Sequence, residues 1–212
     1  MITISRQAGA GGEEIAGLLA SALGWKTLDN ELVETLLSEK GFPQLEAQSY
    51  TERQPVLWRR LSADKDRYLQ FLKMVSYEFA RGGQSIIFGR GGQLLFADVP
   101  GVLRVRVVAP LEDRVQRLRE TAGLEERAAR QRIAASDNHR EGFYRFLFHA
   151  DWNSPALYDL VLNTRLVSRA GAADLIMRAL ASKDVAEQAP GIARRLESLY
   201  QMNPRRADSY RR

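Results

Sequence analysis

The sequence predicts an α/β fold in which helices cover a parallel sheet. Short apolar stretches alternate along the chain with segments whose apolar residues recur at helical spacing, a pattern typical of parallel sheets. The first apolar stretch runs into a glycine-rich turn, and a helical pattern begins directly after it. The chain has 212 residues, of which 45% are hydrophobic and 27% charged, which suffices for one domain with a sizeable core.

Glycines mark the ends of several elements in the first half of the chain, because glycine favours the left-handed backbone conformation that ends many helices. In chain order we predict a strand at 2–5, a helix that Gly24 ends, a brief strand in WKTLD, a helix from Asp29 or Asn30 to Gly41, a loop with short helical pieces at 42–63, a helix at 64–81, and a strand with its glycine turn at 85–92.

In the second half, Pro110 opens a helix at a position where its missing N–H costs nothing. Ser168 can cap a helix with its hydroxyl group. In chain order we predict a strand at 102–109, the helix after Pro110, a charged helical stretch at 124–148, a strand at 158–164, a helix from Ser168 to about 181, and an amphipathic helix at 191–200.

Composition excludes several kinds of site. The chain has no cysteine and two histidines, so disulfides, thiolate metal sites and histidine metal sites are not expected. No apolar run approaches the roughly 20 residues of a membrane span, and no signal-peptide pattern follows Met1. We therefore expect a cytoplasmic protein that does not contact a membrane.

The net charge of +5 is concentrated near the C-terminus. Six arginines lie between residues 191 and 212, against two acidic residues. The domain itself is thus almost neutral, and nucleic-acid binding is not expected beyond what this basic tail could contribute. The sequence is compatible with a homo-oligomer.

The glycine turn after the first strand is a candidate phosphate site. Successive backbone N–H groups at the start of a helix attract anions, and glycines allow a phosphate to approach closely. The candidate residues of this loop are Gly9, Ala10, Gly11, Gly12, Glu13 and Glu14. A tight turn without a ligand would have a similar composition.

The loop departs from a complete Walker A motif, which has a lysine that bridges the phosphates and a Ser/Thr that binds magnesium. Here Gly12 takes the place of the lysine, and Glu13 takes the place of the hydroxyl residue. Glu13 could hold Mg²⁺ directly, or it could simply favour the helix N-terminus. Arg6 is the candidate for the missing positive charge, unless it is a surface residue.

Two further segments carry candidate residues. Arg90, in FGRGG, lies at the carboxyl end of a predicted strand, where α/β proteins bind ligands. The segment RQRIAASDNHREGFYRF supplies Arg132, Asp137 and Arg140, with Asp137 and Arg140 on one helical face. Arginines beside a phosphate site suggest a lid that closes over a transferring phosphoryl group, although an isolated pair is usually a surface salt bridge.

These segments, together with YDLVLNT, resemble the cytidylate-kinase-like family within the P-loop nucleoside monophosphate kinase group. The resemblance covers about residues 1–180. It implies a P-loop NTPase fold, a three-layer sandwich around a five-stranded parallel sheet. We expect one domain at 1–182 with a lid-like segment at about 124–150, and a basic C-terminal extension at 183–212.

The resemblance also implies a function: transfer of the γ-phosphoryl group of ATP, with Mg²⁺, to a nucleoside monophosphate or a related small acceptor. We expect Arg6, Arg132 and Arg140 to be catalytic, and by the resemblance Asp29, Arg90 and Asp137 would bind the acceptor. Cytidylate kinases keep the loop lysine, and they have an aspartate where this chain has Gly91. A degenerate kinase that binds nucleotide as a regulatory module is therefore the alternative.

Overall fold

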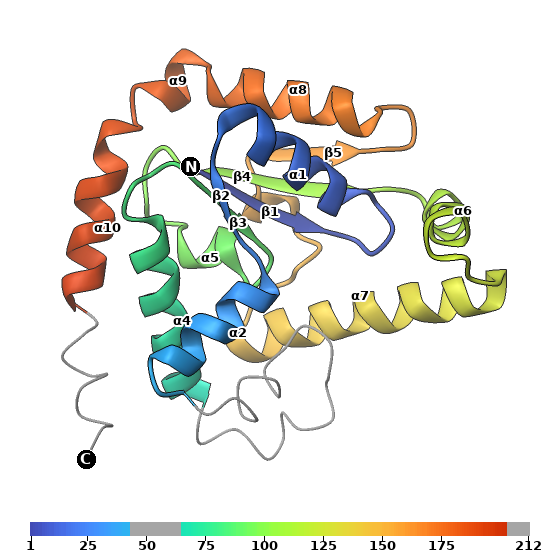
Figure 1. Cartoon of the computed structure of the whole chain (residues 1–212), viewed down its shortest axis with the longest axis horizontal. Coiled ribbons are helices and arrows are strands. Elements are labelled where there is room, and N and C mark those ends of the chain that lie inside the picture. The colour runs from blue at the N-terminus through green and yellow to red at the C-terminus, as the bar shows by residue number, and fades with distance from the viewer. Residues whose placement is uncertain (43–64, 203–212) are drawn as a thin grey trace.

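A five-stranded parallel sheet, in the order β2-β3-β1-β4-β5, lies at the centre of the molecule (Figure 1). The computed structural model describes residues 1–42 and 65–202. Because parallel strands end at the same edge, and β1 is the middle strand, the loop after β1 emerges at the centre of that edge. The strands are β1 (Ile2–Arg6), β2 (Lys26–Leu28), β3 (Ser85–Phe88), β4 (Leu103–Val108) and β5 (Leu160–Asn163).

The connections between the strands are mostly helical. In chain order the helices are α1 (Gly12–Leu23), α2 (Asn30–Glu39), α4 (Lys65–Ala80), α5 (Gly92–Leu95), α6 (Leu111–Ala122), α7 (Glu126–Phe148), the 3₁₀ turn η1 (Pro155–Leu157), α8 (Arg169–Leu180), α9 (Lys183–Ala186) and α10 (Pro190–Met202). Asp29 caps α2, and Ser168 caps α8 through the Gly171 N–H at 3.0 Å.

Helices cover both faces of the sheet, which makes three layers (Figure 1). Helices α1 and α8 pack on one face, where Ile2 and Ile4 of β1 meet the apolar side chains of both helices. Helices α2, α4, α5 and α10 and the C-terminal half of α7 form the core on the other face. Side chains alternate between the faces of a strand, so Arg6 lies on the same face as Ile4, below the start of α1.

The predicted α/β fold is confirmed, with its five strands, their order along the chain and the long helices. The boundaries differ by one or two residues at most ends. The short helices α5 and α9 were not predicted, because four residues are too few to show a helical period. In the expected loop at 42–63, Phe42 is buried, and the remainder lies outside the described residues.

Helices α9 and α10 follow α8 and end the described part of the chain at Met202. Helix α10 lies against α4, with Ile192 and Leu196 fully buried, and Glu197 pairs with Arg81 at 2.5 Å. The last four arginines lie outside the described residues. Within residues 1–42 and 65–202, no helix is both long and apolar enough to cross a membrane.

A buried polar cluster fixes the segment between α7 and β5 to the sheet. Arg106 of β4 donates to the Trp152 carbonyl oxygen and, at 2.7 Å, to Asn153 Oδ1, and its guanidinium lies 4.3 Å from the Trp152 ring centroid. Trp152 Nε1 donates to Ser5 Oγ at 2.8 Å. The cluster thus holds this segment against β1, one residue before Arg6.

The starts of β4 and β5 are joined by an ion pair. Arg104 donates from Nε and Nη2 to the two carboxylate oxygens of Asp159, at 3.0 and 2.5 Å, and its backbone N–H donates to the same carboxylate at 2.8 Å. Burial acts to raise the pKa of Asp159, but these hydrogen bonds from Arg104 outweigh it and lower the pKa below its ordinary value.

We expect Asp159→Asn to lower the free energy of unfolding at neutral pH by about 1 kcal/mol, since a partly exposed pair is screened by solvent. The native pKa is the lower one, so this stabilisation is present above the unfolded pKa of about 3.9 and is lost as the pH falls through the native pKa. Urea unfolding across this range measures the difference. The exposed Asp174→Asn is the control, and a difference from wild type that persists in strong acid would contradict the expectation.

Candidate phosphate-binding site

The loop between β1 and α1 has the backbone geometry of an anion site. Gly11 is the N-cap of α1 in the left-handed conformation, with φ of 83°, and the helix begins at the next residue. A side chain at this position would be strained, and it would also meet the Arg169 side chain at 3.0 Å. The first N–H groups of α1 therefore face the carboxyl edge of the sheet, where an anion can approach them.

Arg6 occupies the space beside Gly12. A Cβ atom at position 12 would lie 2.7 Å from both Cβ and Cγ of Arg6, closer than Cβ contacts occur. These two atoms are held by the strand and cannot move aside as the end of a flexible side chain could. Hence the glycine in the lysine position makes room for Arg6, which occupies the space that any side chain there would need.

The Arg6 guanidinium is fixed close to the helix start. Its side chain is 6% exposed, Nε donates to Glu13 Oε1 at 3.1 Å, and its Cζ lies 4.1 Å from the centroid of the Phe88 ring. A carboxylate and an aromatic face thus hold a permanent cation at the base of the loop. The sequence hypothesis of a surface arginine does not fit this burial.

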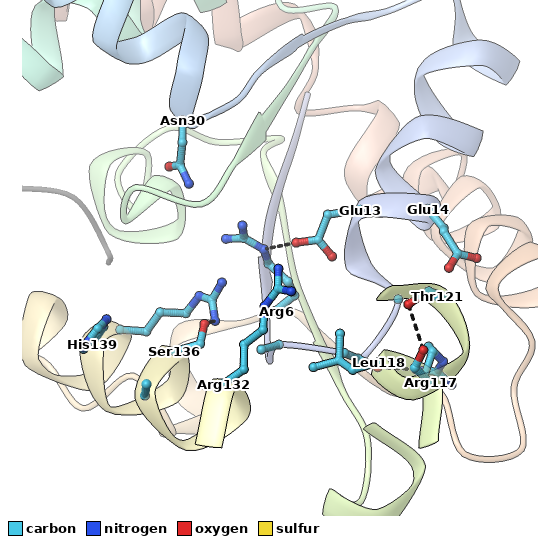
Figure 2. Close-up of a pocket in the computed structure, with 15 residues that line it drawn as sticks. Arg6, Glu13, Glu14, Asn30, Arg117, Leu118, Thr121, Arg132, Ser136 and His139 are labelled. Atoms are coloured by element: carbon cyan, nitrogen blue, oxygen red, sulfur yellow. Dashed lines mark hydrogen bonds and ion pairs between the residues drawn. The ribbon is translucent and has the colours of Figure 1, made fainter. Parts of the chain in front are cut away.

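A cavity of about 630 Å³ opens in front of the loop, between the start of α1 and helices α6 and α7 (Figure 2). Its lining brings together residues from β1, α1, α6 and α7 that are far apart in the sequence. Of the predicted site residues, the cavity is lined by Arg6, Gly9, Gly11, Glu13, Glu14, Arg132 and Arg140. Ala10 and Gly12 are buried and do not line the cavity.

Helix α7 supplies two of the predicted arginines to the cavity wall opposite α1 (Figure 2). Arg140 is largely buried, and its Nη1 donates to Ser136 Oγ at 2.6 Å. Arg132 lies two turns earlier and is exposed. The C-terminal half of the same helix belongs to the core, through Phe143, Tyr144 and Leu147. Helix α7 is thus anchored at one end while its arginines face the cavity.

Arg90 does not line the cavity; it is enclosed by protein partners. It is 1% exposed and donates to Asn30 Oδ1, Tyr68 OH and Glu34 Oε1, at 2.8, 2.8 and 2.7 Å. Its φ of 52° is unusual for a residue other than glycine. Asn30 connects this cluster to the cavity, which it lines from the start of α2 (Figure 2).

The two predicted aspartates have partners within the chain. Asp29 is the exposed N-cap of α2 and accepts a hydrogen bond from the Leu32 N–H at 2.9 Å. Asp137 accepts from Arg114 Nη1 at 2.6 Å and lies 3.4 Å from the Ala8 backbone nitrogen. Asp137 therefore contacts the first residues of the glycine loop, and Arg140 is only 3.9 Å away.

Arg117 and Arg169 are not among the residues that the sequence predicted for the site. In the structure Arg117 Nη1 donates to the Gly9 carbonyl oxygen at 2.7 Å, and Arg169 Nε pairs with Glu14 at 2.7 Å. Burial, followed by the neighbouring Arg169 cation, lowers the pKa of Arg117. The packing of α6 and α8 against the loop creates these contacts, and no local sequence motif predicts that packing.

Packing also explains the glycine at position 91, where the family resemblance leads us to expect an aspartate. Its φ is 75°, and a Cβ atom there would overlap with the Phe148 ring. Phe148, the last residue of α7, packs in turn on Phe143 and Tyr144. An aromatic ring from α7 thus fills the position in which a side chain of residue 91 would lie.

Glu13 has the exposure that a metal ligand needs. Its side chain is 62% exposed at the cavity mouth, and only one carboxylate oxygen is engaged by Arg6. In the described part of the chain, no group of three or more acidic or histidine side chains could hold a metal by itself. The single exposed carboxylate of Glu13 suits Mg²⁺, which is usually bound by one or two carboxylates together with substrate phosphates.

We expect Gly12→Ala to lower the free energy of unfolding by about 1–3 kcal/mol, because the added Cβ overlaps with Arg6. Gly17→Ala in the same helix meets no atom within 4 Å, and it should stabilise by up to about 1 kcal/mol. In an Arg6→Gly background the cost of Gly12→Ala should almost disappear. Thermal or urea unfolding of the four proteins of this cycle measures the coupling, and additive effects would contradict the contact.

Among proteins of known function, the chain has sequence relatives of two kinds. The uronate isomerase of Corynebacterium glutamicum is 34% identical over 98 residues, but these cover 46% of this chain and only 19% of that relative. The cytidylate kinase of Pyrococcus horikoshii is 27% identical over 183 residues, which cover 85% of this chain and 88% of the relative.

A crystal structure of an uncharacterized protein from Eubacterium ventriosum has the same fold. It superposes with a TM-score of 0.66 at 20% identity, over 86% of this chain and 98% of that one. Residues 1–166 match the cytidylate kinase-like family. The chain therefore belongs to the cytidylate kinase-like family.

Proposed function

We propose that this protein is an ATP-dependent phosphotransferase that moves the γ-phosphoryl group to a nucleoside monophosphate or a related small acceptor. The observation that carries the proposal is the buried Arg6 guanidinium packed against Gly12 at the base of the loop. It supplies a positive charge beside the helix start in a chain that lacks the loop lysine. The cytoplasm is the proposed location, in keeping with the absence of cysteine.

The charges around the cavity suit a transferring phosphoryl group. Arg6, Arg117, Arg132 and Arg140 line it, against the two carboxylates of Glu13 and Glu14. Phosphoryl transfer depends on positioning and on neutralising the charge of the transferred group, which fixed guanidinium groups can do. Arg6 would contact the donor phosphates from below, and Arg132 and Arg140 would contact the transferring group from α7.

Mg²⁺ would bind to Glu13, at the mouth of the cavity. When bound, the ion shields the phosphate oxygens from the Glu13 and Glu14 carboxylates and polarises the transferred group. The second oxygen of Glu13 is the available protein ligand, since Arg6 engages the first. Glu14 is held by Arg169 and is the less suitable of the two.

The acceptor side is proposed from Asp29 and Arg90. For Arg90 to hold an acceptor phosphate, the phosphate would replace the Glu34 carboxylate, which is 27% exposed and is thus the more accessible member of that pair. Asn30 and Tyr68 would keep the guanidinium in place during this exchange.

A coupled assay tests the proposal. Folded protein with Mg²⁺ and ATP is offered CMP, dCMP, UMP and other small phosphate or hydroxyl acceptors, and ADP formation above the acceptor-free rate is measured. We expect turnover with at least one nucleoside monophosphate. Tight MgATP binding by calorimetry without any turnover would instead indicate the regulatory module, and the phosphotransferase proposal would be withdrawn.

Replacing Arg6 by glutamine should reduce kcat/KM by on the order of 10²–10³, because a preorganised charge at the phosphates is lost. The exposed Arg127, on α7 but outside the cavity, provides the control: Arg127→Gln should leave the rate unchanged. Steady-state kinetics, with circular dichroism to confirm folding, separate the two variants. An Arg6→Gln enzyme with wild-type kinetics would show that the positive charge is supplied elsewhere.

The metal site can be tested with two neighbouring glutamates, Glu13 as the proposed ligand and Glu14 as its control. We expect Glu13→Gln to raise the Mg²⁺ concentration for half-maximal rate by at least about tenfold, the lower end of what loss of an outer-shell partner costs a metal site. Glu14→Gln should change it much less, since Glu14 pairs with Arg169. Magnesium titrations at saturating ATP measure both constants. Equal shifts would argue for a general charge effect and against a ligand role for Glu13.

A further inference from the structure

We propose that Asp137 is a positioning residue of the donor loop, which acts with Arg114 to hold the Ala8 peptide between α6 and α7. This assignment places Asp137 on the donor side, in contrast to the acceptor role expected from the family resemblance. It rests on the proposed function in so far as the loop binds ATP phosphates. The contacts themselves concern the protein alone.

The two side chains hold both polar atoms of Ala8. Asp137 Oδ1 accepts from the Ala8 N–H at 3.4 Å, and Arg114 Nη1 donates to the Ala8 carbonyl oxygen at 3.4 Å. The same Arg114 nitrogen donates to Asp137 Oδ2 at 2.6 Å, a charge-assisted bond. The two side chains therefore hold each other in place. Together they contact the loop backbone through one donor, on Arg114, and one acceptor, on Asp137.

The pair is largely enclosed at the junction of the glycine loop, α6 and α7. The side chains of Arg114 and Asp137 are 8% and 18% exposed, unlike the exposed i,i+3 salt bridges of helix surfaces. A buried ion pair contributes little net stability, because the desolvation of both charges offsets their attraction. Its main effect here is geometric, since it fixes α6 and α7 relative to the loop.

Helix α6 lies so close to the loop that the position of the helix constrains the loop backbone. A Cβ atom at Gly9 would lie 2.8 Å from the Arg114 carbonyl oxygen, so the loop backbone lies directly against the helix. One turn later, Arg117 Nη1 donates to the Gly9 carbonyl oxygen at 2.7 Å. Two successive loop carbonyls thus point to arginines of α6.

The direction of the neighbouring amide follows from the planar peptide bond. In a trans peptide the C=O and the next N–H point in opposite directions. Holding the Ala8 carbonyl toward Arg114 therefore turns the Gly9 N–H to the other side, and Gly9 lines the cavity. Asp137 and Arg114 thereby set the orientation of a loop amide that phosphate oxygens could meet.

The test compares Asp137→Asn and Arg114→Gln with the control Asp174→Asn, an exposed aspartate of α8 away from the cavity. Hydrogen exchange of the loop amides in the ligand-free protein reports on the clamp directly. Calorimetry with MgADP as the donor-site probe and CMP as the acceptor-site probe reports on the two sites. Circular dichroism confirms that each variant is folded.

We expect the amide of Ala8 to exchange faster in both variants, and MgADP affinity to fall by on the order of tenfold. CMP affinity should stay at the wild-type value, and Asp174→Asn should change nothing. The double variant should be little worse than either single variant, because both remove the same clamp. Protection at Ala8 that is unchanged in both variants would overturn the proposal.

Loss of CMP affinity at constant MgADP affinity would also overturn it, since Asp137 would then serve the acceptor. If the wild-type protein binds no adenine nucleotide, the proposed phosphotransferase fails on that result alone. The exchange rate at Ala8 still decides whether Asp137 and Arg114 hold the loop.

Discussion

The contact between Arg6 and Gly12 is the constraint on which the candidate site depends. Arg6 is the last residue of the central strand, and strand alternation directs its side chain to the face that α1 covers. Gly12 is the first residue of that helix and leaves the space that Arg6 fills. The position of the buried charge is therefore set by the sheet and by the helix start together, and it does not depend on a flexible side chain of the loop.

Cations from four different elements surround the loop. Arg6 comes from β1, Arg114 and Arg117 from α6, Arg140 from α7, and Arg169 from the start of α8. Several of these arginines bind loop carbonyl oxygens or first-turn carboxylates, so the loop is stabilised from outside as well as by its own glycines. The N-terminal half of α7 is thereby joined to the loop, although its sequence suggests a separate lid.

Much of the fold could be predicted from the sequence, because its strands are apolar and its glycines and caps mark the helix ends. The missing lysine was enough to suggest Arg6 as the substitute charge. The contact between Arg6 and Gly12 could not be predicted, since it depends on the distance between the strand and the helix. Arg114 and Arg117 lie on a helix with many charged residues, and their burial appears only when α6 packs against Gly9. Likewise, Asp137 shares a helical face with Arg140, yet its main partner lies 23 residues away on α6.

The two glycines at positions 12 and 91 restrict the order in which sequence changes can occur. Each stands where a distant side chain, Arg6 or Phe148, fills the room that a larger residue would take. A protein with lysine at position 12 or aspartate at position 91 must first acquire the glycine there. Only then can it acquire the larger side chain at position 6 or 148. The reverse order passes through an overpacked protein, so introducing a lysine at position 12 would require two substitutions and would begin at Arg6.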